Sequence, residues 1–214
     1  VRIQSGRSIK NFTLKYTIAD IPDGATAQGT IYVSFANIPP VAQDDQATIL
    51  WNRPALIDVI SNDSDENSEG VTKLQVLNVQ QPQNGRVEIF NATCIKYTPN
   101  SGFIGSDSFR YRCSDGKDPS PYATVSVQVI NHAPVAINDT ISVHWRNSVR
   151  IKVLNNDYDV DNDPLSIIDV TQPSDGHVVI EGSVLLYTPT QVGSEVIEYT
   201  ISDSAYNDTA VVHV

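Results

Sequence analysis

The chain has 214 residues, enough for two domains of roughly 100 residues each. Hydrophobic residues make up 40% and charged residues 18%, a balance that fills small cores and leaves a polar surface. The formal net charge of -11 repels phosphate backbones, which argues against nucleic-acid binding. No apolar run reaches the roughly 20 residues that span a bilayer, so we expect no membrane contact within this segment. Because the chain opens at Val1 and contains no Met, we expect an interior piece of a longer protein.

The first predicted elements are two strands in residues 1–37. Residues 14–20 are similar to residues 109–115, and residues 30–35 are similar to residues 124–129. We therefore expect residues 1–37 to be the C-terminal part of a β-sandwich repeat. The segment ends at Asn37-Ile38-Pro39-Pro40, where proline cannot donate to a strand ladder and favours a short extended linker.

Two full repeats are predicted after this linker, at 38–131 and 132–214, with Asn131-His132-Ala133-Pro134 joining them. The first landmark recurs after 94 residues, from Pro40 to Pro134 (134 − 40). Six landmarks recur in the same order, and a recurrence of this length indicates a tandem array. They are Pro40-Val41-Ala42 and Pro134-Val135-Ala136, Trp51 and Trp145, Val59–Asp65 and Val153–Asp159, Gln81–Gly85 and Gln172–Gly176, Tyr97–Pro99 and Tyr187–Pro189, and Tyr111–Asp115 and Tyr199–Asp203.

Within each repeat the hydrophobic period is two, which is typical of strands. Ala123, Val125, Val127 and Val129 alternate with polar residues. Asp-Gly, Asn-Gly and Thr-Pro pairs punctuate the apolar segments, and no segment has a helical stripe. About seven short strands in about 90 residues predict an all-β protein of tandem antiparallel β-sandwich domains with Greek-key connections. The alternative, a β-solenoid, has a much shorter period.

The order of motifs resembles the cadherin-like or Ig-like tandem repeats of large bacterial surface adhesins, including RTX-type proteins. The motifs are PVAxDD, NDxD, YTP and GxDSFxYxxSDG, the last matched best by residues 105–116. The resemblance implies an extracellular or cell-surface rod that is often stiffened by calcium. The chain departs from the pattern at Ser204, where glycine is expected, and in the less acidic turn of the first repeat.

The acidic turn of the second repeat is the strongest candidate site. Its oxygen-bearing side chains recur on alternate residues and suit Ca²⁺, which takes six to eight hard oxygen ligands. They are Asn156, Asp157, Asp159, Asp161 and Asp163, to which the resemblance adds Asp139 and Asp203. The counterparts in the first repeat are Asp45, Asn62, Asp63, Asp65, Glu66 or Glu69, and Asp115. The alternative is a solvated turn in which Asp and Asn bond to their own backbone.

Five Asn-x-Ser/Thr sequons predict N-glycosylation, which would indicate a eukaryotic surface despite the bacterial character of the repeat. Their asparagines are Asn11, Asn62, Asn91, Asn138 and Asn207. Asn62 also lies in the acidic turn, where a glycan and a metal ion would compete.

The two cysteines, Cys94 and Cys113, lie on consecutive predicted strands. If these strands form a simple hairpin, the two residues face each other and a disulfide is expected. The alternative is two buried free thiols, because Val184 and Ile201 occupy the corresponding positions in the second repeat.

No catalytic motif is present, and the four histidines have no metal-ligand spacing. We therefore expect a structural or adhesive array, such as a spacer or a filament component, and not an enzyme. Its expected partners are neighbouring repeats of the same or identical chains, and cell-surface glycans or proteins.

The alternative is an accessory carbohydrate- or protein-binding module of a secreted enzyme, which requires an exposed aromatic cluster. The candidates are scattered along the repeats: Tyr32, Phe35, Tyr122, Tyr158 and Tyr206. Packing is expected to account for Trp51 and Trp145.

Overall fold

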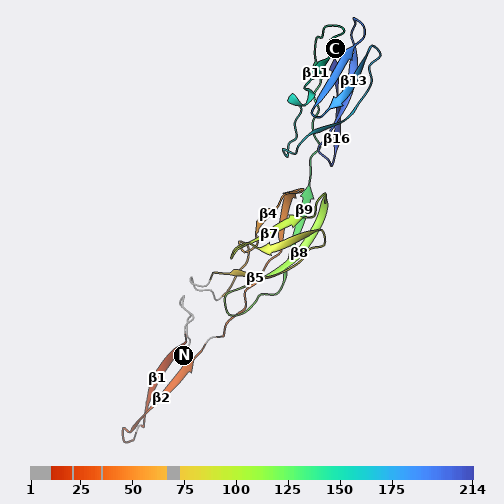
Figure 1. Ribbon diagram of the computed structural model, residues 1–214. Helices are drawn as coiled ribbons and strands as arrows, with labels where there is room; N and C mark the ends of the chain where they lie inside the picture. Colours follow the sequence, from red (N-terminus) through yellow and green to blue (C-terminus); the bar gives the residue numbers. More distant parts are fainter. Residues whose placement is uncertain (1–10, 21, 35, 67–72) are drawn as a thin grey trace. The chain divides into compact units, whose positions relative to one another are not determined.

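A computed structural model describes residues 11–20, 22–34, 36–66 and 73–214 (Figure 1). The described residues form β-strands and their connecting loops, with a single 3-10 turn, η1 (Val153–Asn155). The chain divides into two compact units, Val1–Val129 and Ile130–Val214. The predicted all-β class is confirmed. Phe35 and Glu69, both named as candidates above, lie outside the described residues.

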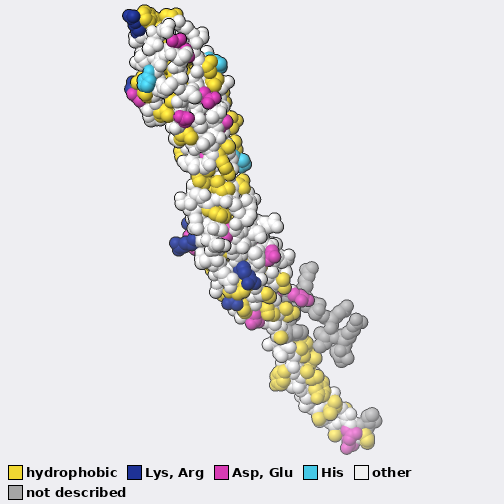
Figure 2. Space-filling model, turned by 90° about the vertical axis from the view of Figure 1, so that its right-hand side faces the viewer, with side chains coloured by type: hydrophobic (Ala, Val, Ile, Leu, Met, Phe, Trp, Pro, Cys, Tyr) yellow, Lys and Arg dark blue, Asp and Glu magenta, His cyan; other side chains and the backbone are white. Residues whose placement is uncertain are grey.

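The first unit begins with a hairpin of β1 (Phe12–Ala19) and β2 (Thr26–Val33). The strands pair antiparallel, with Tyr16 opposite Gly29 and Leu14 opposite Ile31. Because side chains alternate along a strand, one face of the hairpin is apolar throughout. Tyr16, Ile18 and Ile31 on this face are exposed to solvent, and Figure 2 shows yellow side chains along the hairpin at the lower end of the view.

The rest of the first unit is a sandwich of two sheets. One sheet has the order β3-β9-β8-β5 and the other β4-β7-β6. The strands are β3 (Asp45–Leu50), β4 (Ala55–Asp58), β5 (Gln75–Gln80), β6 (Gly85–Ile89), β7 (Cys94–Pro99), β8 (Gly105–Ser114) and β9 (Ala123–Ile130). Alternate residues of both sheets face inward and form the core, among them Ile95, Tyr97, Phe109, Tyr111 and Val125.

The second unit repeats this topology, with sheets β10-β16-β15-β12 and β11-β14-β13. Its strands are β10 (Asp139–Thr140), β11 (Val149–Ile151), β12 (Ser166–Val170), β13 (Gly176–Glu181), β14 (Val184–Pro189), β15 (Val196–Ser202) and β16 (Asn207–His213). The short β10 pairs parallel with β16, whereas the other pairs in this unit are antiparallel. Leu185, Tyr187, Ile197, Tyr199 and Ile201 lie in one buried cluster.

The packing explains the recurring Gln-Pro-x-x-Gly landmark. The side-chain amide of Gln81 accepts a hydrogen bond from the backbone N–H of Val87 and donates one to its carbonyl, and Gln172 does the same with Val178. The glycine that follows leaves room for a ring, because a Cβ at Gly85 would lie 2.6 Å from the ring of Tyr97. The landmark is thus a structural requirement of the sandwich.

The prediction that the two cysteine-bearing strands, β7 and β8, form a hairpin is wrong. β7 pairs with β4 and β6, whereas β8 pairs with β5 and β9 in the other sheet. The chain crosses from one sheet to the other between Pro99 and Gly105, as a Greek-key connection does. Cys94 lies opposite Asp58, and both Cys94 and Cys113 are free thiols. The disulfide expected from the hairpin is not present in the structure.

The two tryptophans do not share one environment, so packing accounts for only one of them. Trp51 is 6% exposed, whereas Trp145 is 47% exposed. The guanidinium of Arg146 lies 3.8 Å from the centroid of the Trp145 ring. The turn itself is the same in both repeats, because Asn52 and Arg146 both adopt positive φ, at 51° and 66°.

Candidate metal centre

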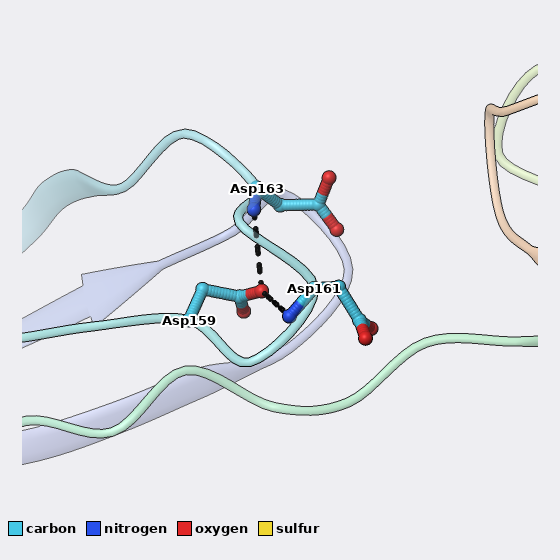
Figure 3. Close-up of side chains that lie close together, drawn as sticks. All are labelled: Asp159, Asp161 and Asp163. Atoms are coloured by element: carbon cyan, nitrogen blue, oxygen red, sulfur yellow. Dashed lines mark hydrogen bonds between the residues drawn. The ribbon is translucent and has the colours of Figure 1, made fainter.

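The loop between η1 and β12 curls around one carboxylate. Asp159 Oδ1 accepts hydrogen bonds from the backbone N–H groups of Asp161 and Asp163, at 2.7 and 3.2 Å. Asn162, between them, has φ 59°, a left-handed conformation that Asn tolerates better than most residues. In Figure 3 the carboxylate of Asp159 lies inside the loop, and those of Asp161 and Asp163 project from it toward one side.

This loop gathers three carboxylates in a partly dehydrated place. One carboxylate oxygen from each of Asp159, Asp161 and Asp163 lies within 4.8 Å of the others. Asp159 and Asp161 are 8% and 5% exposed, and Asp159 Oδ2 is buried without a hydrogen-bond partner. Calcium–oxygen distances of about 2.3–2.6 Å allow one ion to contact oxygens at this separation. The donor set therefore suits a hard divalent cation.

The segment that leads into the second repeat is fastened to this loop and to the turn after β15. The backbone N–H of His132 donates to Asp161 Oδ2 at 2.8 Å, and His132 Nδ1 lies 2.8 Å from Asp161 Oδ1. The side chain of Asn131 donates to Asp203 Oδ2 at 2.8 Å. Two predicted ligands, Asp161 and Asp203, are thus connected through two consecutive linker residues.

The turn after β15 has an equivalent after β8. Asp203 Oδ1 accepts from the N–H groups of Ala205 and Tyr206, and Asp115 Oδ1 accepts from those of Lys117 and Asp118. In the first repeat the linker residue Asn37 donates to Asp115 at 2.7 Å, as Asn131 does to Asp203. Burial alone would raise the pKa of Asp115, but the hydrogen bonds from Asp118, Lys117 and Asn37 hold it below its ordinary value.

This turn also explains why glycine is expected at the position of Ser204. Gly116 has φ 89° and Ser204 has φ 84°, so the backbone of both turns is left-handed. Glycine adopts this conformation at little cost, whereas serine is strained in it. The glycine expected from the motif is the residue that the turn geometry favours.

A second group of carboxylates surrounds the hydroxyl of Tyr199. This hydroxyl lies 3.2 Å from Asp139 Oδ2, 3.2 Å from Asp157 Oδ1 and 3.0 Å from the carbonyl oxygen of Ile137. Burial, as the main cause, raises the pKa of Asp139 and of Asp157. The side chain of Asn156 donates a hydrogen bond to the carbonyl of Ile137, which also accepts one from the Tyr199 hydroxyl.

The first repeat has the same arrangement around Tyr111. Its hydroxyl lies 2.9 Å from Asp63 Oδ1 and 2.5 Å from the carbonyl oxygen of Val59. Asp45 Oδ2 and Asp63 Oδ2 are buried without hydrogen-bond partners. Burial and the charge of Asp63 outweigh the hydrogen bond from Tyr111 and raise the pKa of Asp45 to about 6. One hydroxyl proton cannot satisfy two carboxylates, so Asp45 retains a proton more readily than usual.

The predicted calcium ligands therefore fall into three groups by their hydrogen bonds. Asp159, Asp161 and Asp163 form the compact cluster, Asp139, Asn156 and Asp157 surround Tyr199, and Asp203 anchors the linker. In the first repeat, Asp45 and Asp63 surround Tyr111, Asp115 anchors the linker, and half-buried Asp65 corresponds to Asp159. The residues that would correspond to Asp161 and Asp163 lie outside the described residues.

The sequence patterns did not indicate that the linker asparagines, His132 and the two tyrosines are partners of these carboxylates. A signal was present, because Asn37 and Asn131 stand at the same place before the proline of each repeat.

The asparagines of all five sequons are exposed, and N-glycosylation stays a prediction. Asn62 donates its side-chain N–H to the carbonyl of Asp44, a bond that a glycan there would disturb.

A family profile described as "Bacterial Ig domain" matches residues 37–128 and 131–214, most of the chain. The chain belongs to this family. The two matched segments are the two sandwiches described above, so the resemblance to bacterial Ig-like tandem repeats is confirmed.

Several solved structures are similar to the chain at low identity. An endo-fucoidan hydrolase of glycoside hydrolase family 107, MfFcnA4, is 18% identical over 96% of this chain and 34% of that one, with a TM-score of 0.35. The protocadherin GammaB4 extracellular domain is 16% identical over 97% and 37%, with a TM-score of 0.43. The surface layer protein SbsC, domains 4–9, is 14% identical over 95% and 35%, with a TM-score of 0.36.

The chain spans about a third of the length of each of these three structures. At these scores the likeness transfers no activity or ligand. A search of curated proteins finds no match. Among the described residues, no helix has the length and hydropathy needed to cross a membrane.

Proposed function

We propose that the chain is part of an extracellular or cell-surface array of bacterial Ig domains that acts as a spacer or adhesive rod and has no catalytic role. The observation that carries the proposal is the linker anchor, which has the same form in both repeats. Asn37 binds Asp115 and Asn131 binds Asp203, each at a distance below 3 Å. A fastened linker restricts how freely the chain enters each repeat, which favours a spacer over a flexible tether.

The array is proposed to include a third repeat, of which residues 1–37 are the C-terminal part. In support, Tyr16 pairs with Gly29 as Tyr111 pairs with Ala123 and Tyr199 with Ala210. In the two full repeats this face of the hairpin is buried against the opposite sheet, whereas Tyr16 and Ile18 are exposed. A two-stranded hairpin alone is marginally stable, so the missing cover would come from the other strands of that repeat.

A chimera tests the third repeat. Residues 38–104 are duplicated and fused ahead of residue 10, so that strands of the first repeat can cover the hairpin. We expect amides of residues 12–33 to become protected from hydrogen exchange, and Tyr16→Ala to remove the protection while Tyr32→Ala, on the opposite face, keeps it. Unchanged exchange in the fused chain would refute the assignment.

Calcium binding by Asp159, Asp161 and Asp163 is proposed as the means of stiffening. A bound Ca²⁺ would offset the repulsion among three carboxylates and give the orphaned Asp159 Oδ2 a partner. Asp161 also binds the backbone of His132, so ordering the loop would order the linker.

Calcium titration followed by thermal unfolding tests this site. At free calcium about 100 times the Kd, binding stabilises the folded state by about 2.7 kcal/mol. We expect CaCl₂ to raise the Tm relative to EDTA in the wild type and in Asp169→Asn, an exposed carboxylate outside the loop, but not in Asp161→Asn/Asp163→Asn. Equal Tm values for the wild type in CaCl₂ and EDTA would exclude the site and leave the linker anchor unaffected.

A further inference from the structure

Two arginines and a tyrosine form a cationic site on the outer face of the first repeat. Phe109, Tyr111 and Cys113 of β8 point into the core, so Arg110 and Arg112 lie on the opposite face of the strand. The guanidinium carbons of both arginines lie 5.2 Å from the centroid of the Tyr122 ring. Both guanidinium groups thus lie close to one ring. The two positive charges are therefore separated by at most about twice that distance.

The fold leaves this pair of charges uncompensated. Arg86 and Arg150 form ion pairs with Glu88 and Glu181, whereas neither Arg110 nor Arg112 forms one within the described part of the chain. The Nε of Arg112 is buried and has no hydrogen-bond partner. Burying such a donor without a partner is unfavourable, and more so when the group is charged.

The neighbouring side chains do not supply an anion. The residues opposite on β5 are neutral amides, Gln80 beside Arg110 and Asn78 beside Arg112. Opposite Arg110 on β9 is Thr124, whose backbone N–H donates to Asp44 at 2.7 Å. Asp44 accepts this backbone hydrogen bond and forms no ion pair with Arg110 or Arg112 within the described part of the chain.

The sandwich itself does not require this site. Arg110 and Arg112 flank Tyr111, and the residues that flank Tyr199 in the second repeat are Glu198 and Thr200. Tyr122 precedes Ala123, and Thr209 precedes the equivalent Ala210. Because the second repeat folds in the same way without any of the three residues, a structural need does not explain the cluster.

An open groove on the same repeat indicates the chemistry of the ligand. Its volume is about 490 Å³. Apart from Val127 and Asp107, it is lined by hydroxyl and amide side chains: Gln46, Gln83, Asn84, Ser106, Ser108, Ser126 and Gln128. The carboxylate of Asp107 is occupied by hydrogen bonds from the N–H groups of Asn84 and Ser108 and from the hydroxyl of Tyr97.

We propose that this face of the first repeat binds an acidic polysaccharide, with the carboxylate or sulfate groups on Arg110 and Arg112 and the sugar hydroxyls in the groove. Ser106, Ser108, Arg110 and Arg112 follow one another on one face of β8, so the groove and the cations lie along a single line. At about 3.4 Å per residue this line is roughly 20 Å long, the length of several sugar units. A protein partner fits less well, because protein interfaces centre on apolar anchors and this groove has none that are exposed.

Binding of defined polymers tests the proposal in calcium-free buffer containing 100–150 mM salt, a range in which weak non-specific attraction is screened to about 8–10 Å. The probes are sodium alginate oligomers for carboxylates, dextran sulfate for sulfates, neutral dextran, and poly-glutamate as an acidic peptide. We expect binding to alginate, to dextran sulfate or to both, with no binding to dextran and at least tenfold weaker binding to poly-glutamate. Whichever acidic polymer binds identifies the anion.

Matched variants separate a built site from general charge. We expect Arg110→Gln/Arg112→Gln to weaken binding at least tenfold, and Arg86→Gln/Lys96→Gln, with the same change in charge on the other sheet, to weaken it less than twofold. Tyr122→Phe should keep the affinity, because it keeps the ring, and Tyr122→Ser should lower it. Circular dichroism confirms that each variant is folded. Equal losses in the two double variants, equal binding of poly-glutamate, or failure of the wild type to bind either acidic polysaccharide would overturn the proposal.

Discussion

The carboxylates around Tyr111 make the stability of the first repeat depend on pH. The pKa of Asp45 is raised from 3.8 to about 6, chiefly by burial and further by the charge of Asp63. A carboxyl whose pKa is higher in the folded state stabilises the fold fully below the unfolded value of about 3.9, and this contribution disappears as the pH rises through about 6. We therefore expect the free energy of unfolding to fall between pH 4 and pH 7.

The magnitude follows from the shift. Raising a carboxyl pKa from 3.8 to about 6 corresponds to about 3 kcal/mol for a fully buried group, because each tenfold change in an equilibrium constant is worth about 1.36 kcal/mol. Asp45 is only half-buried, so solvent screens part of this and we expect about 1–2 kcal/mol. Asp45→Asn removes the charge and adds N–H donors, so it should abolish this loss and stabilise the repeat at pH 7.5 by a similar amount.

Urea unfolding in EDTA at several pH values between 4.5 and 7.5 measures the effect. Trp51, buried in the first repeat, reports on that repeat when the exposed Trp145 is replaced by Phe. The contributions of groups that the two proteins share cancel in the difference between wild type and Asp45→Asn. Asp139→Asn, in the second repeat, is the matched control and should leave this transition unchanged. If wild type and Asp45→Asn lose stability equally between pH 5 and pH 7.5, the account of the Tyr111 group is wrong.

Two further predictions concern the turns and the thiols. Ser204→Gly should stabilise the second repeat by about 0.5–1 kcal/mol, and Gly116→Ser should destabilise the first by at least as much, because both positions have positive φ. Thermal unfolding measures both effects. A loss of stability in Ser204→Gly would contradict the proposed backbone strain at this position. Both cysteines should be alkylated in the unfolded protein without prior reduction. In the folded protein, half-buried Cys94 should react well before Cys113, because burial raises the pKa of the Cys113 thiol to about 11. An unfolded protein that is not alkylated and whose mass is lower by two hydrogens would instead show a disulfide.

The sequence by itself determined the all-β class and the tandem sandwiches. These depend on local features: alternating apolar residues at Ala123–Val129, and turn residues such as Gly116 whose conformational preference acts within a few residues. The Ser204 position is an example, because the motif alone predicted a glycine where the backbone has φ 84°. Recurrence made these local signals stronger, since the same landmarks appear twice.

Only the tertiary structure decided which residues meet. Cys94 and Cys113 lie close in sequence but on different sheets, because strand order in a sandwich depends on long-range pairing that spacing does not reveal. The acidic residues looked like one site, yet the fold assigned Asp157 to Tyr199 and Asp159 to the loop cluster, two residues apart in the chain. Likewise Asn131 bonds to Asp203, 72 residues away. Such contacts form when two sheets close over a shared core, and the carboxylates at its rim then bind whichever donors the folded chain brings there.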